Sequence, residues 1–410
     1  MALYDDAQKI IQAAIHAAMP DTAVKKALEE GDLGSGKIVL IAVGKAAWQM
    51  AKVAAEQLRG RLSDGVVITK YDHVKGEIPG IRCFEAGHPV PDTNSFAATE
   101  AALKAVQGLT EQDTVLFLLS GGGSALFEKP LVPAEELESV TNQLLASGAD
   151  IIEINTVRKR ISGVKGGRFA QHCLPAKVYS VILSDIIGDP LDMIASGPAC
   201  ADQSTCAKAK AVIEKYQIKL RKETLELLEI ETPKSLSNVT TKVTGSVKQL
   251  CMAAADTCKR LGYDPVILTA ELCCQAKEAG CFLGTIGKFH HKDGLAQAYI
   301  AGGETVVKLT GDGKGGRNQE LALAAAPYID GLKNVAVFSV GSDGSDGPTD
   351  AAGGYTDGDT VKKLSEQGMT VDSILESNDA YNGLKVCDGL IITGPTGTNV
   401  NDISVVLIGA

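Results

Sequence analysis

The chain has 410 residues, of which 45% are hydrophobic and 22% charged, and its formal net charge is −10. The composition is that of a globular protein, and the length favours two domains over one. The acidic balance, without any basic block, argues against a nucleic acid or an anionic membrane surface as partner. No apolar run reaches the roughly 18 residues that a membrane-spanning helix needs.

The first 19 residues, MALYDDAQKIIQAAIHAAM, combine early acids with an amphipathic pattern. A secretion signal has a basic start and a cleavage site instead, so we expect an opening helix and a cytoplasmic protein. The ten cysteines form no CxxC pair. Without a secretion signal they are expected to be buried free thiols, and no histidine joins them to make a zinc site.

Several apolar, β-branched runs along the chain are followed by a loop and a helix-like pattern. Near-continuous apolar strands that alternate with helices predict a parallel sheet covered on both faces. Ligands bind at the C-terminal ends of such strands, which is where the polar loops of this chain lie. The runs are Ile38–Val43, Gly65–Thr69, Thr114–Leu119, Val178–Leu183, Pro265–Thr269 and Val335–Val340.

A charged, helix-like segment, Thr205–Leu236, ends at Thr232-Pro233-Lys234 and in the polar stretch Ser235–Asn238. We take this stretch as the linker. It divides the chain into an N-terminal domain, residues 1–240, and a C-terminal domain, residues 241–410.

Two loops in the first half are typical of anion binding. Lys45 follows the first strand, where an ammonium group can contact a phosphate oxygen. An ordinary exposed lysine is the alternative, but a cation at a helix start opposes the helix dipole and calls for an anion. The second loop predicts a concave nest of backbone amides, or else a flexible turn. It consists of Ser120, Gly121, Gly122, Gly123 and Ser124.

A dense basic stretch follows at Asn155–Arg168. If the stretch is one helix, Arg158 and Lys165 lie two turns apart on one face. Arg158, Lys159 or Arg160 then binds a carboxylate or nucleotide phosphates. A solvated helical face is the alternative of equal weight.

Two acidic loops follow strands further on. Asp189 suits Mg²⁺ binding or the role of general base. Asp343 and Asp346 lie in a loop with three acids in eight residues and suit a metal or a substrate hydroxyl. The alternative for both loops is an ordinary turn capped by aspartate.

The block from Gly302 to Glu320 has the highest density of candidate groups. Thr305–Leu309 predicts a strand, residues 311–316 form a glycine-rich loop, and a helix is expected to start near Asn318. A glycine loop at a helix N-terminus, together with Lys314 and Arg317, predicts an anion site such as one for phosphate. Glu304 and Asn318 are further candidates for substrate binding.

These blocks, in this order along nearly the whole chain, resemble the class II glycerate kinase family, the glycerate 2-kinases. The matching segments include VGKAA at Val43, LLSGGGSAL at Leu118, INTVRKRISGVKGGR at Ile154, LSDIIGDPLDMIASGP at Leu183, GKGGRNQE at Gly313 and TGPTGTNVNDI at Thr393. The resemblance implies a two-domain α/β fold. A Rossmann-like parallel-sheet domain is followed by a smaller α/β domain of the MOFRL type, with the active site in the cleft between them.

The resemblance also implies a reaction, in which ATP phosphorylates D-glycerate to 2-phosphoglycerate with Mg²⁺. The important lysine and arginine of the family fall on Lys45 and Arg317. We expect these two cations to clamp the transferred phosphoryl group as the domains close, and Asp189 to assist as metal ligand or base. The expected partners are therefore glycerate and ATP, and a homodimer remains open.

Two other functions remain in view. Family members have also been labelled hydroxypyruvate reductases, but this chain lacks the glycine-and-acid fingerprint of an NAD(P) site. A non-catalytic sensor is the other alternative. A sensor has no need of a cationic clamp for a transition state.

Overall fold

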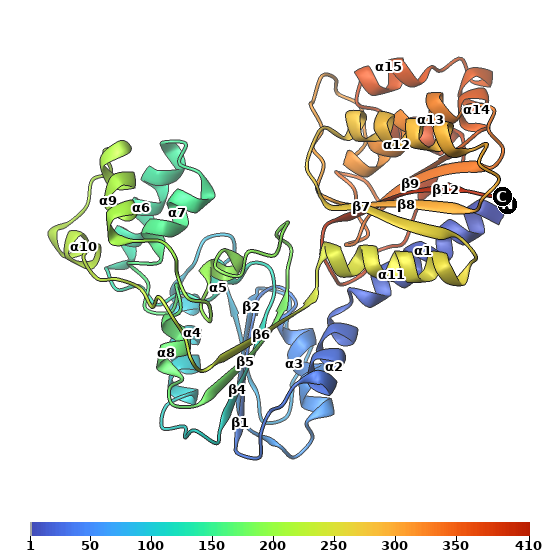
Figure 1. The fold of residues 1–410 in the computed structure, drawn as a ribbon. Coiled ribbons are helices and arrows are strands. Elements are labelled where there is room, and N and C mark those ends of the chain that lie inside the picture. The colour runs from blue at the N-terminus through green and yellow to red at the C-terminus, as the bar shows by residue number, and fades with distance from the viewer. Residues whose placement is uncertain (1) are drawn as a thin grey trace. The chain divides into compact units, whose positions relative to one another are not determined.

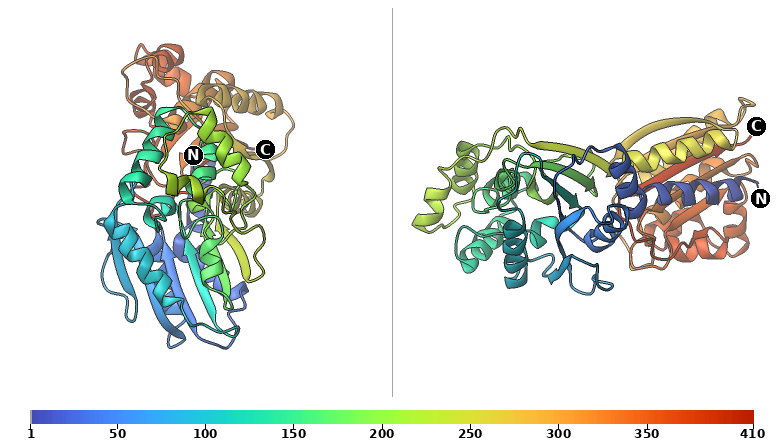
Figure 2. Two further views of the ribbon diagram at one scale, coloured as in Figure 1. Left: turned by 90° about the vertical axis from the view of Figure 1, so that its left-hand side faces the viewer. Right: turned by 90° about the horizontal axis from the view of Figure 1, so that it is seen from below.

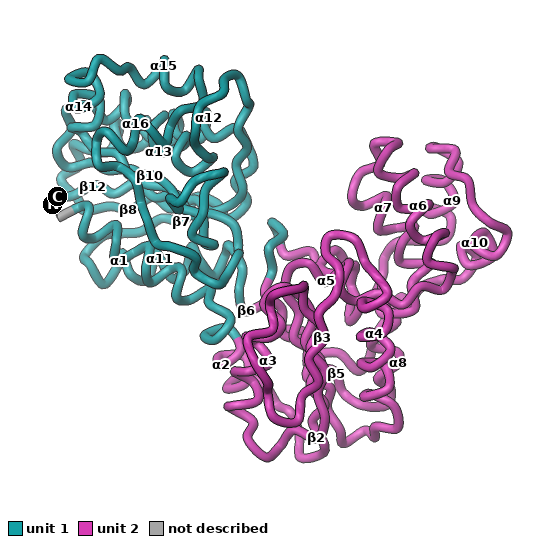
Figure 3. Tube along the Cα trace, turned by 180° about the vertical axis from the view of Figure 1, so that it is seen from behind, with its two compact units in different colours: residues 1–23, 184–188, 245–410 teal, residues 24–183, 189–244 magenta. Residues whose placement is uncertain are grey.

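The structure is a computed structural model that describes residues 2–410. It divides into two compact units (Figure 3). The unit that we call N-terminal consists of Val24–Leu183 and Asp189–Thr244. The unit that we call C-terminal comprises Gly245–Ala410, the short segment Ser184–Gly188 and the start of the chain up to Ala23.

The N-terminal unit is built on a six-stranded sheet of order β3-β2-β1-β4-β5-β6. The pairings from β3 through β5 are all parallel. This is the strand order of doubly wound, dinucleotide-binding sheets, and it confirms the expected parallel α/β fold. The strands are β1 (Ile38–Val43), β2 (Leu62–Lys70), β3 (Arg82–Ala86), β4 (Thr114–Leu119), β5 (Lys177–Leu183) and β6 (Val239–Gly245).

Helices cover this sheet, so every residue of the central strands β1 and β4 is buried. Phe117, Phe127 and Phe169 pack together in the core, with ring centroids 4.7–5.9 Å apart. A separate group of helices, α6, α7, α9 and α10, encloses its own apolar cluster (Figure 1). The helices are α2 (Pro20–Glu30), α3 (Ala47–Gln57), α4 (Thr93–Ala105), α5 (Gly123–Leu126), α6 (Ala134–Ala146), α7 (Ile151–Arg158), α8 (Arg168–His172), α9 (Cys206–Lys215) and α10 (Lys222–Leu227).

The C-terminal unit has a second six-stranded sheet, of order β11-β10-β9-β12-β8-β7. The expected parallel pairing is correct for β7, which runs parallel to β8, but wrong for β9, which is antiparallel to both its neighbours. A loop without a helix joins β9 to β10, and such a connection permits antiparallel pairing. The strands are β7 (Asp264–Leu272), β8 (Gln297–Gly303), β9 (Val335–Gly341), β10 (Gly353–Asp357), β11 (Leu390–Ile391) and β12 (Asp402–Ile408).

Helices α1 and α11 lie side by side against one face of the second sheet, and α12 and α13 cover the other face (Figures 1 and 2). The hydroxyl of Tyr263 donates to Asp6 of α1 (2.9 Å), and the Tyr4 ring meets Tyr355 edge-on at 5.1 Å. The helices are α1 (Ala2–Ala17), α11 (Val247–Arg260), α12 (Ala276–His290), α13 (Arg317–Ile329), α14 (Thr360–Glu366), α15 (Val371–Glu376) and α16 (Ala380–Val386).

The limits of the two units differ from the domain limits expected from the sequence. The expected domain of residues 1–240 includes the opening helix, whereas α1 packs into the C-terminal unit through its apolar face. The expected linker Ser235–Asn238 does not join the units, because it leads into β6 at the edge of the first sheet. Within residues 2–410, no helix combines the length and the apolarity needed to cross a membrane.

Candidate active site

The loops after β1 and β4 lie against each other at the carboxyl edge of the N-terminal sheet. The two strands are parallel neighbours with Val43 opposite Leu119, so the residues after them meet. The amide of Lys45 donates to the carbonyl of Gly121 (2.9 Å), and the amide of Ala46 donates to the Ser120 hydroxyl (3.1 Å). Gly44 has a φ of 120°, and a Cβ there would collide with Ser120.

The loop SGGGS carries backbone donors that no group in residues 2–410 satisfies. In the described chain, the amides of Gly121, Gly122, Gly123 and Ser124 make no hydrogen bond. Most buried or half-buried backbone amides in proteins are paired, so consecutive unpaired amides indicate a place for an external acceptor. The amides expected to form a nest are thus without an acceptor in residues 2–410, and the nest itself stays a prediction.

Lys45 supplies a cation beside these amides. Its side chain is exposed, and among residues 2–410 its ammonium group makes no ion pair or hydrogen bond. A Cβ on Gly122, which has a φ of 88°, would lie 3.3 Å from Cγ of Lys45. The lysine side chain thus runs directly past the nest.

His88 is a third member of this group that the sequence analysis did not single out. Its ring lies against the loop, since a Cβ on Gly122 would be 3.0 Å from its Cδ2 atom. Burial, with the nearby charges of Lys45 and Lys70, lowers the pKa of His88 below its usual value. A neutral imidazole can donate one hydrogen bond and accept another without adding charge. The segment GHPVPD, residues 87–92, contains this histidine and is the sequence signal that could have indicated it.

A strained turn borders the loop on its other side. The Ser124 hydroxyl lies 3.1 Å from that of Ser196, which donates to Asn155 (3.0 Å). Ala195 and Ser196 both have left-handed backbone, with φ of 50° and 62°. Such residues cost of order 1–3 kcal/mol each and cluster at functional sites. Neither Asn155 nor Ser196 was predicted as a site residue.

Arg158 and Lys165 meet, but by a different route from the predicted helix. Helix α7 ends at Arg158, so the two residues do not share a helical face. Both lie next to the buried carboxylate of Glu128, with Nζ of Lys165 at 2.9 Å and Nη2 of Arg158 at 3.8 Å. Both also donate to the carbonyl of Ser124. Arg158 therefore contacts the loop Ser120–Ser124 through the carbonyl of Ser124 and not through the loop amides.

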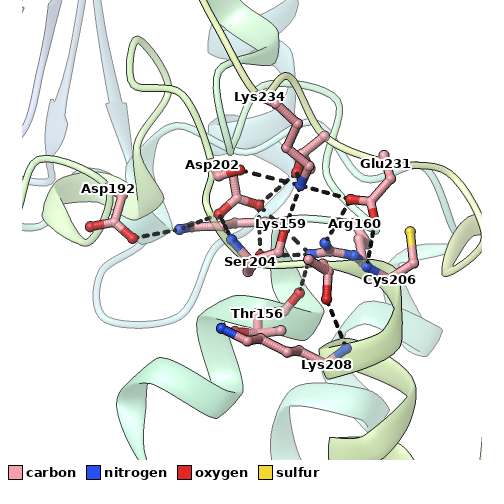
Figure 4. Close-up of polar contacts among 12 residues, drawn as sticks. Thr156, Lys159, Arg160, Asp192, Asp202, Ser204, Cys206, Lys208, Glu231 and Lys234 are labelled. Carbon is pink, nitrogen blue, oxygen red and sulfur yellow. Dashed lines mark hydrogen bonds and ion pairs between the residues drawn. The ribbon is translucent and has the colours of Figure 1, made fainter.

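Arg160, predicted to bind substrate, is fully buried in an ionic network (Figure 4). Its guanidinium group donates to the Thr156 carbonyl (2.8 Å), the Ser204 hydroxyl (2.9 Å) and Glu231 (3.3 Å). Lys159 is equally buried and is paired with Asp192 and Asp202. These contacts and their burial give Arg160 and Lys159 a structural role.

Asp189 lies in the loop after β5 with a φ of 50°. It is partly exposed, and its carboxylate makes no hydrogen bond or ion pair in the described part of the chain. A free carboxylate at the carboxyl end of a strand remains available to a metal ion or a proton.

The C-terminal unit contains an open cavity of about 920 Å³, and several predicted site residues line it. They are Glu304, Arg317, Asp343 and Asp346. Arg317, the first residue of α13, forms a bidentate pair with Asp402 (Nε–Oδ2 2.6 Å, Nη2–Oδ1 3.0 Å). Its Nη1 donates to Glu304 (2.7 Å), so three of its five N–H groups are used and about a third of its side chain is exposed.

The glycine-rich loop before α13 differs from the predicted anion site. The amides of Gly311, Gly313 and Lys314 donate to Asn378, Ser377 and Asp379. A Cβ on Gly311 or Gly313 would meet the backbone of residues 377–379 within 2.7 Å. These glycines therefore allow two backbone segments to pack closely. The expected strand Thr305–Leu309 is likewise absent, since its only sheet contact is an isolated bridge at Val306.

The N-terminus of α13 is capped by the protein itself. Asp346 accepts hydrogen bonds from the amides of Asn318 (3.1 Å) and Gln319 (2.8 Å), and burial raises its pKa to about 6. The Asn318 side chain is buried between Asp346 and Ser339. The predicted metal role of Asp346 and substrate role of Asn318 are therefore not supported by their contacts.

Two other predictions for this unit also change. Asp343 accepts hydrogen bonds from the amide and the hydroxyl of Ser345. These contacts form an aspartate-capped turn, which was the alternative to a metal or substrate role. Lys314 does not line the cavity, and its ammonium group lies 4.0 Å from the centre of the Tyr381 ring. Among the described residues, no three Asp, Glu, His or Cys side chains gather as a preformed metal cage.

The fold and the loops define an α/β protein with a free cation and free amides at the carboxyl edge of a doubly wound sheet. Residues 6–229 match a family model described as a domain of unknown function (DUF4147), and residues 297–402 match the MOFRL family. The chain belongs to the glycerate 2-kinase family, which the resemblance indicated.

Three proteins illustrate the similarity. The D-glycerate 2-kinase of Thermotoga maritima is 50% identical over 406 residues, which cover 98% of this chain and 97% of that one. The glycerate 2-kinase of Pyrococcus horikoshii is 41% identical over 431 residues, with 98% and 96% covered. A crystal structure of glycerate kinase from Thermotoga maritima matches with a TM-score of 0.95 at 50% identity and covers 100% of both chains.

Proposed function

We propose that this protein is a glycerate 2-kinase, which transfers the γ-phosphoryl group of ATP to the 2-hydroxyl of D-glycerate. The single observation that carries the proposal is the unpaired ammonium group of Lys45 beside four unpaired amides, Gly121 to Ser124. Such a group is suited to phosphate oxygens. The names of the full-length relatives support the choice of glycerate as acceptor.

The reaction makes one bond and breaks one. The 2-hydroxyl oxygen of glycerate bonds to the γ-phosphorus while the bond from that phosphorus to the bridging oxygen of ADP breaks. The hydroxyl proton passes to a base or to water. Phosphoryl transfer needs positioning and charge neutralisation more than covalent chemistry, and fixed N–H groups and cations provide both.

In this mechanism the loop Ser120–Ser124 and Lys45 have complementary roles. The four amides bind phosphate oxygens of the nucleotide and hold the phosphorus in place. Lys45 carries a full charge on a flexible side chain and follows the charge that develops on the transferred group. His88, which is kept neutral, contacts the same region and is suited to a hydrogen bond with a substrate oxygen.

Mg²⁺ is the metal that the family resemblance implies, and one carboxylate, that of Asp189, suits it. Mg²⁺ keeps several waters and needs only one or two protein carboxylates besides the phosphates of the nucleotide. Asp189 offers such a carboxylate, because it is partly exposed and without a protein partner. When bound, the metal neutralises phosphate charge. Asp189 is the alternative acceptor for the hydroxyl proton.

Arg317 is the strongest candidate of the C-terminal unit. The two N–H groups that it does not use within the protein are available to an anion in the cavity. Asp402 and Glu304 hold the guanidinium plane in one orientation, which is the preorganisation that electrostatic catalysis requires. Joint action of Arg317 and Lys45 on one phosphoryl group remains a prediction from the sequence.

The test is ³¹P NMR of the purified protein with ATP, Mg²⁺ and D-glycerate. A 2-phosphoglycerate resonance is the expected product. A 3-phosphoglycerate signal would keep the reaction class and overturn the position of transfer. Intact ATP would overturn the kinase proposal, and hydroxypyruvate with NAD(P)H would then be tried. The reductase has no support in the loop after β1, because Gly44-Lys45 there is not a dinucleotide fingerprint.

A further inference from the structure

The short helix α5, which contains two of the free amides, those of Gly123 and Ser124, rests on a buried ionic triad of Glu128, Arg158 and Lys165. The side chains of Glu128 and Lys165 are fully buried, and that of Arg158 is 13% exposed. The mechanism proposed above uses none of them. Two cations and one anion leave the triad with a net positive charge.

Lys165 directs its N–H groups at both ends of α5. Its Nζ donates to the carbonyl of Ser124 (2.8 Å) and to that of Phe127 (2.9 Å), and it lies 2.9 Å from Glu128. Two of the three N–H groups of the ammonium thus donate to carbonyls, and its charge pairs with Glu128. Arg158 adds a second donor to the Ser124 carbonyl at 3.2 Å.

In this loop the Ser124 carbonyl is hydrogen-bonded, but the amides are not. The Ser124 carbonyl is bound by two cations, whereas the amides of Gly121 to Ser124 find no acceptor in the described residues. A loop that was free to rotate would pair some of these amides with its own carbonyls or with neighbouring ones. The first N–H groups of a helix have no partner within the helix, so the direction of these amides depends on what holds the loop, and the triad contacts the loop at the Ser124 carbonyl.

We propose that Lys165, assisted by Arg158, is a positioning residue that holds the loop amides in the orientation that binds phosphate. The inference rests on the proposed function, because it concerns the same loop. Lys165 itself touches no substrate. It acts through the carbonyl of Ser124, and its positive charge, unscreened by water, also favours an anion at the amides.

The energetic cost of this arrangement agrees with a role beyond stability. Burial lowers the pKa of Lys165 to about 8, against the opposing effect of Glu128. A buried ion pair is often no more stabilising than apolar residues of the same volume. An apolar pair at these positions would fill the core equally well but would leave the two carbonyls of α5 without donors.

The test compares binding of inorganic phosphate, measured by isothermal titration calorimetry, in the full-length wild type and three variants. The double change Glu128→Gln with Lys165→Met removes the lysine together with its carboxylate partner and leaves Arg158, which is 13% exposed, as the one charge of the triad. We expect it to fold and to bind phosphate on the order of 10-fold more weakly, as is typical when a supporting hydrogen bond behind a ligand is lost. In the same variant, the ratio of KM for ATP to kcat should rise as the affinity for phosphate falls.

Arg160→Met is the matched control, because Arg160 is an equally buried cation whose contacts lie outside the loop. It should lose stability but keep the affinity for phosphate. Unchanged affinity in the folded double variant, or equal weakening in Arg160→Met, would overturn the proposal. If the double variant does not fold, Arg158→Gln takes its place, with an expected several-fold loss, and unchanged affinity again counts against the proposal.

These outcomes separate the inference from the proposed function. Phosphate binding that depends on Lys165, without any transfer to glycerate, would remove the kinase proposal and keep the positioning role. A wild type that forms 2-phosphoglycerate but does not bind inorganic phosphate would overturn the positioning role and keep the kinase proposal.

Discussion

The side chain of Lys45 lies against Gly122, so that a Cβ atom on the glycine would be 3.3 Å from Cγ of the lysine. The two residues come from loops after neighbouring parallel strands and meet only at the sheet edge. Their contact brings the side chain of Lys45 to the loop with the free amides. The first two predictions change one of these two residues each.

Lys45→Met should reduce kcat on the order of 10²- to 10³-fold, the usual effect of removing a group that stabilises the transition state. The fold should be unaffected, because the side chain is exposed and has no protein partner in the described chain. ADP release in a coupled assay measures the change. Lys25→Met, at an exposed position of α2, is the control and should retain full activity. Turnover close to normal in Lys45→Met would remove this residue from the mechanism.

Gly122→Ala should impair both phosphate binding and turnover. The φ of 88° costs a side chain about 1–2 kcal/mol, and the new methyl group must also displace His88 or Lys45. Gly108→Ala is the matched control, because it has a similar φ of 71° with nothing within 4 Å of the new Cβ. Both variants should show a similar fall in Tm, but only Gly122→Ala should lose activity. Equal activity in the two would separate Gly122 from the site.

Arg317→Lys keeps the charge but loses the planar fork that pairs with Asp402. We expect turnover to fall on the order of 10²-fold, as for other cationic clamps. Stability should also decrease, since Asp402 is buried and would keep a poorer partner. Arg82→Lys, at an exposed pair with Asp64, is the control. A variant with reduced stability and normal kcat would assign Arg317 a purely structural role.

Asp346 should make stability depend on pH. Burial raises its pKa from 3.8 to about 6, so the native state holds this proton more tightly than the unfolded chain does. Its stabilising contribution is therefore complete below about pH 4 and is lost as the pH rises through about 6. Two pKa units correspond to roughly 3 kcal/mol. Urea unfolding at pH 4 to 7 should show wild type losing stability relative to Asp346→Asn by up to that amount. Parallel profiles for the two proteins would contradict the raised pKa.

The loop Ser120–Ser124 could be recognised from sequence because its signal is local. A buried apolar run followed by three glycines and two hydroxyls predicts a strand, a turn and exposed amides without knowledge of the rest of the chain. The same holds for Lys45, whose position at a helix start already indicated a missing anion. The alternation of strands and helices was enough to predict the α/β class.

The loop at residues 311–316 has an equally strong local pattern, yet its amides at Gly311, Gly313 and Lys314 are occupied. The acceptors lie more than 60 residues later in the chain, at Ser377 to Asp379. The partners of Arg317 and of the α13 amides, Asp402 and Asp346, are 85 and 28 residues away. No spacing rule predicts such pairs, because they form where separate segments pack together.

Sequence by itself determined six apolar runs that become strands, where the chain must turn and which side chains have the chemistry for phosphate. Backbone sterics and burial of apolar runs act within a few residues, so these properties are encoded locally. The tertiary structure alone decided which of those groups remain free for a ligand. Arg160, Asn318 and Asp346 are satisfied by distant partners, whereas Lys45 and the amides of Gly121 to Ser124 are not, and only the packed fold determines that difference.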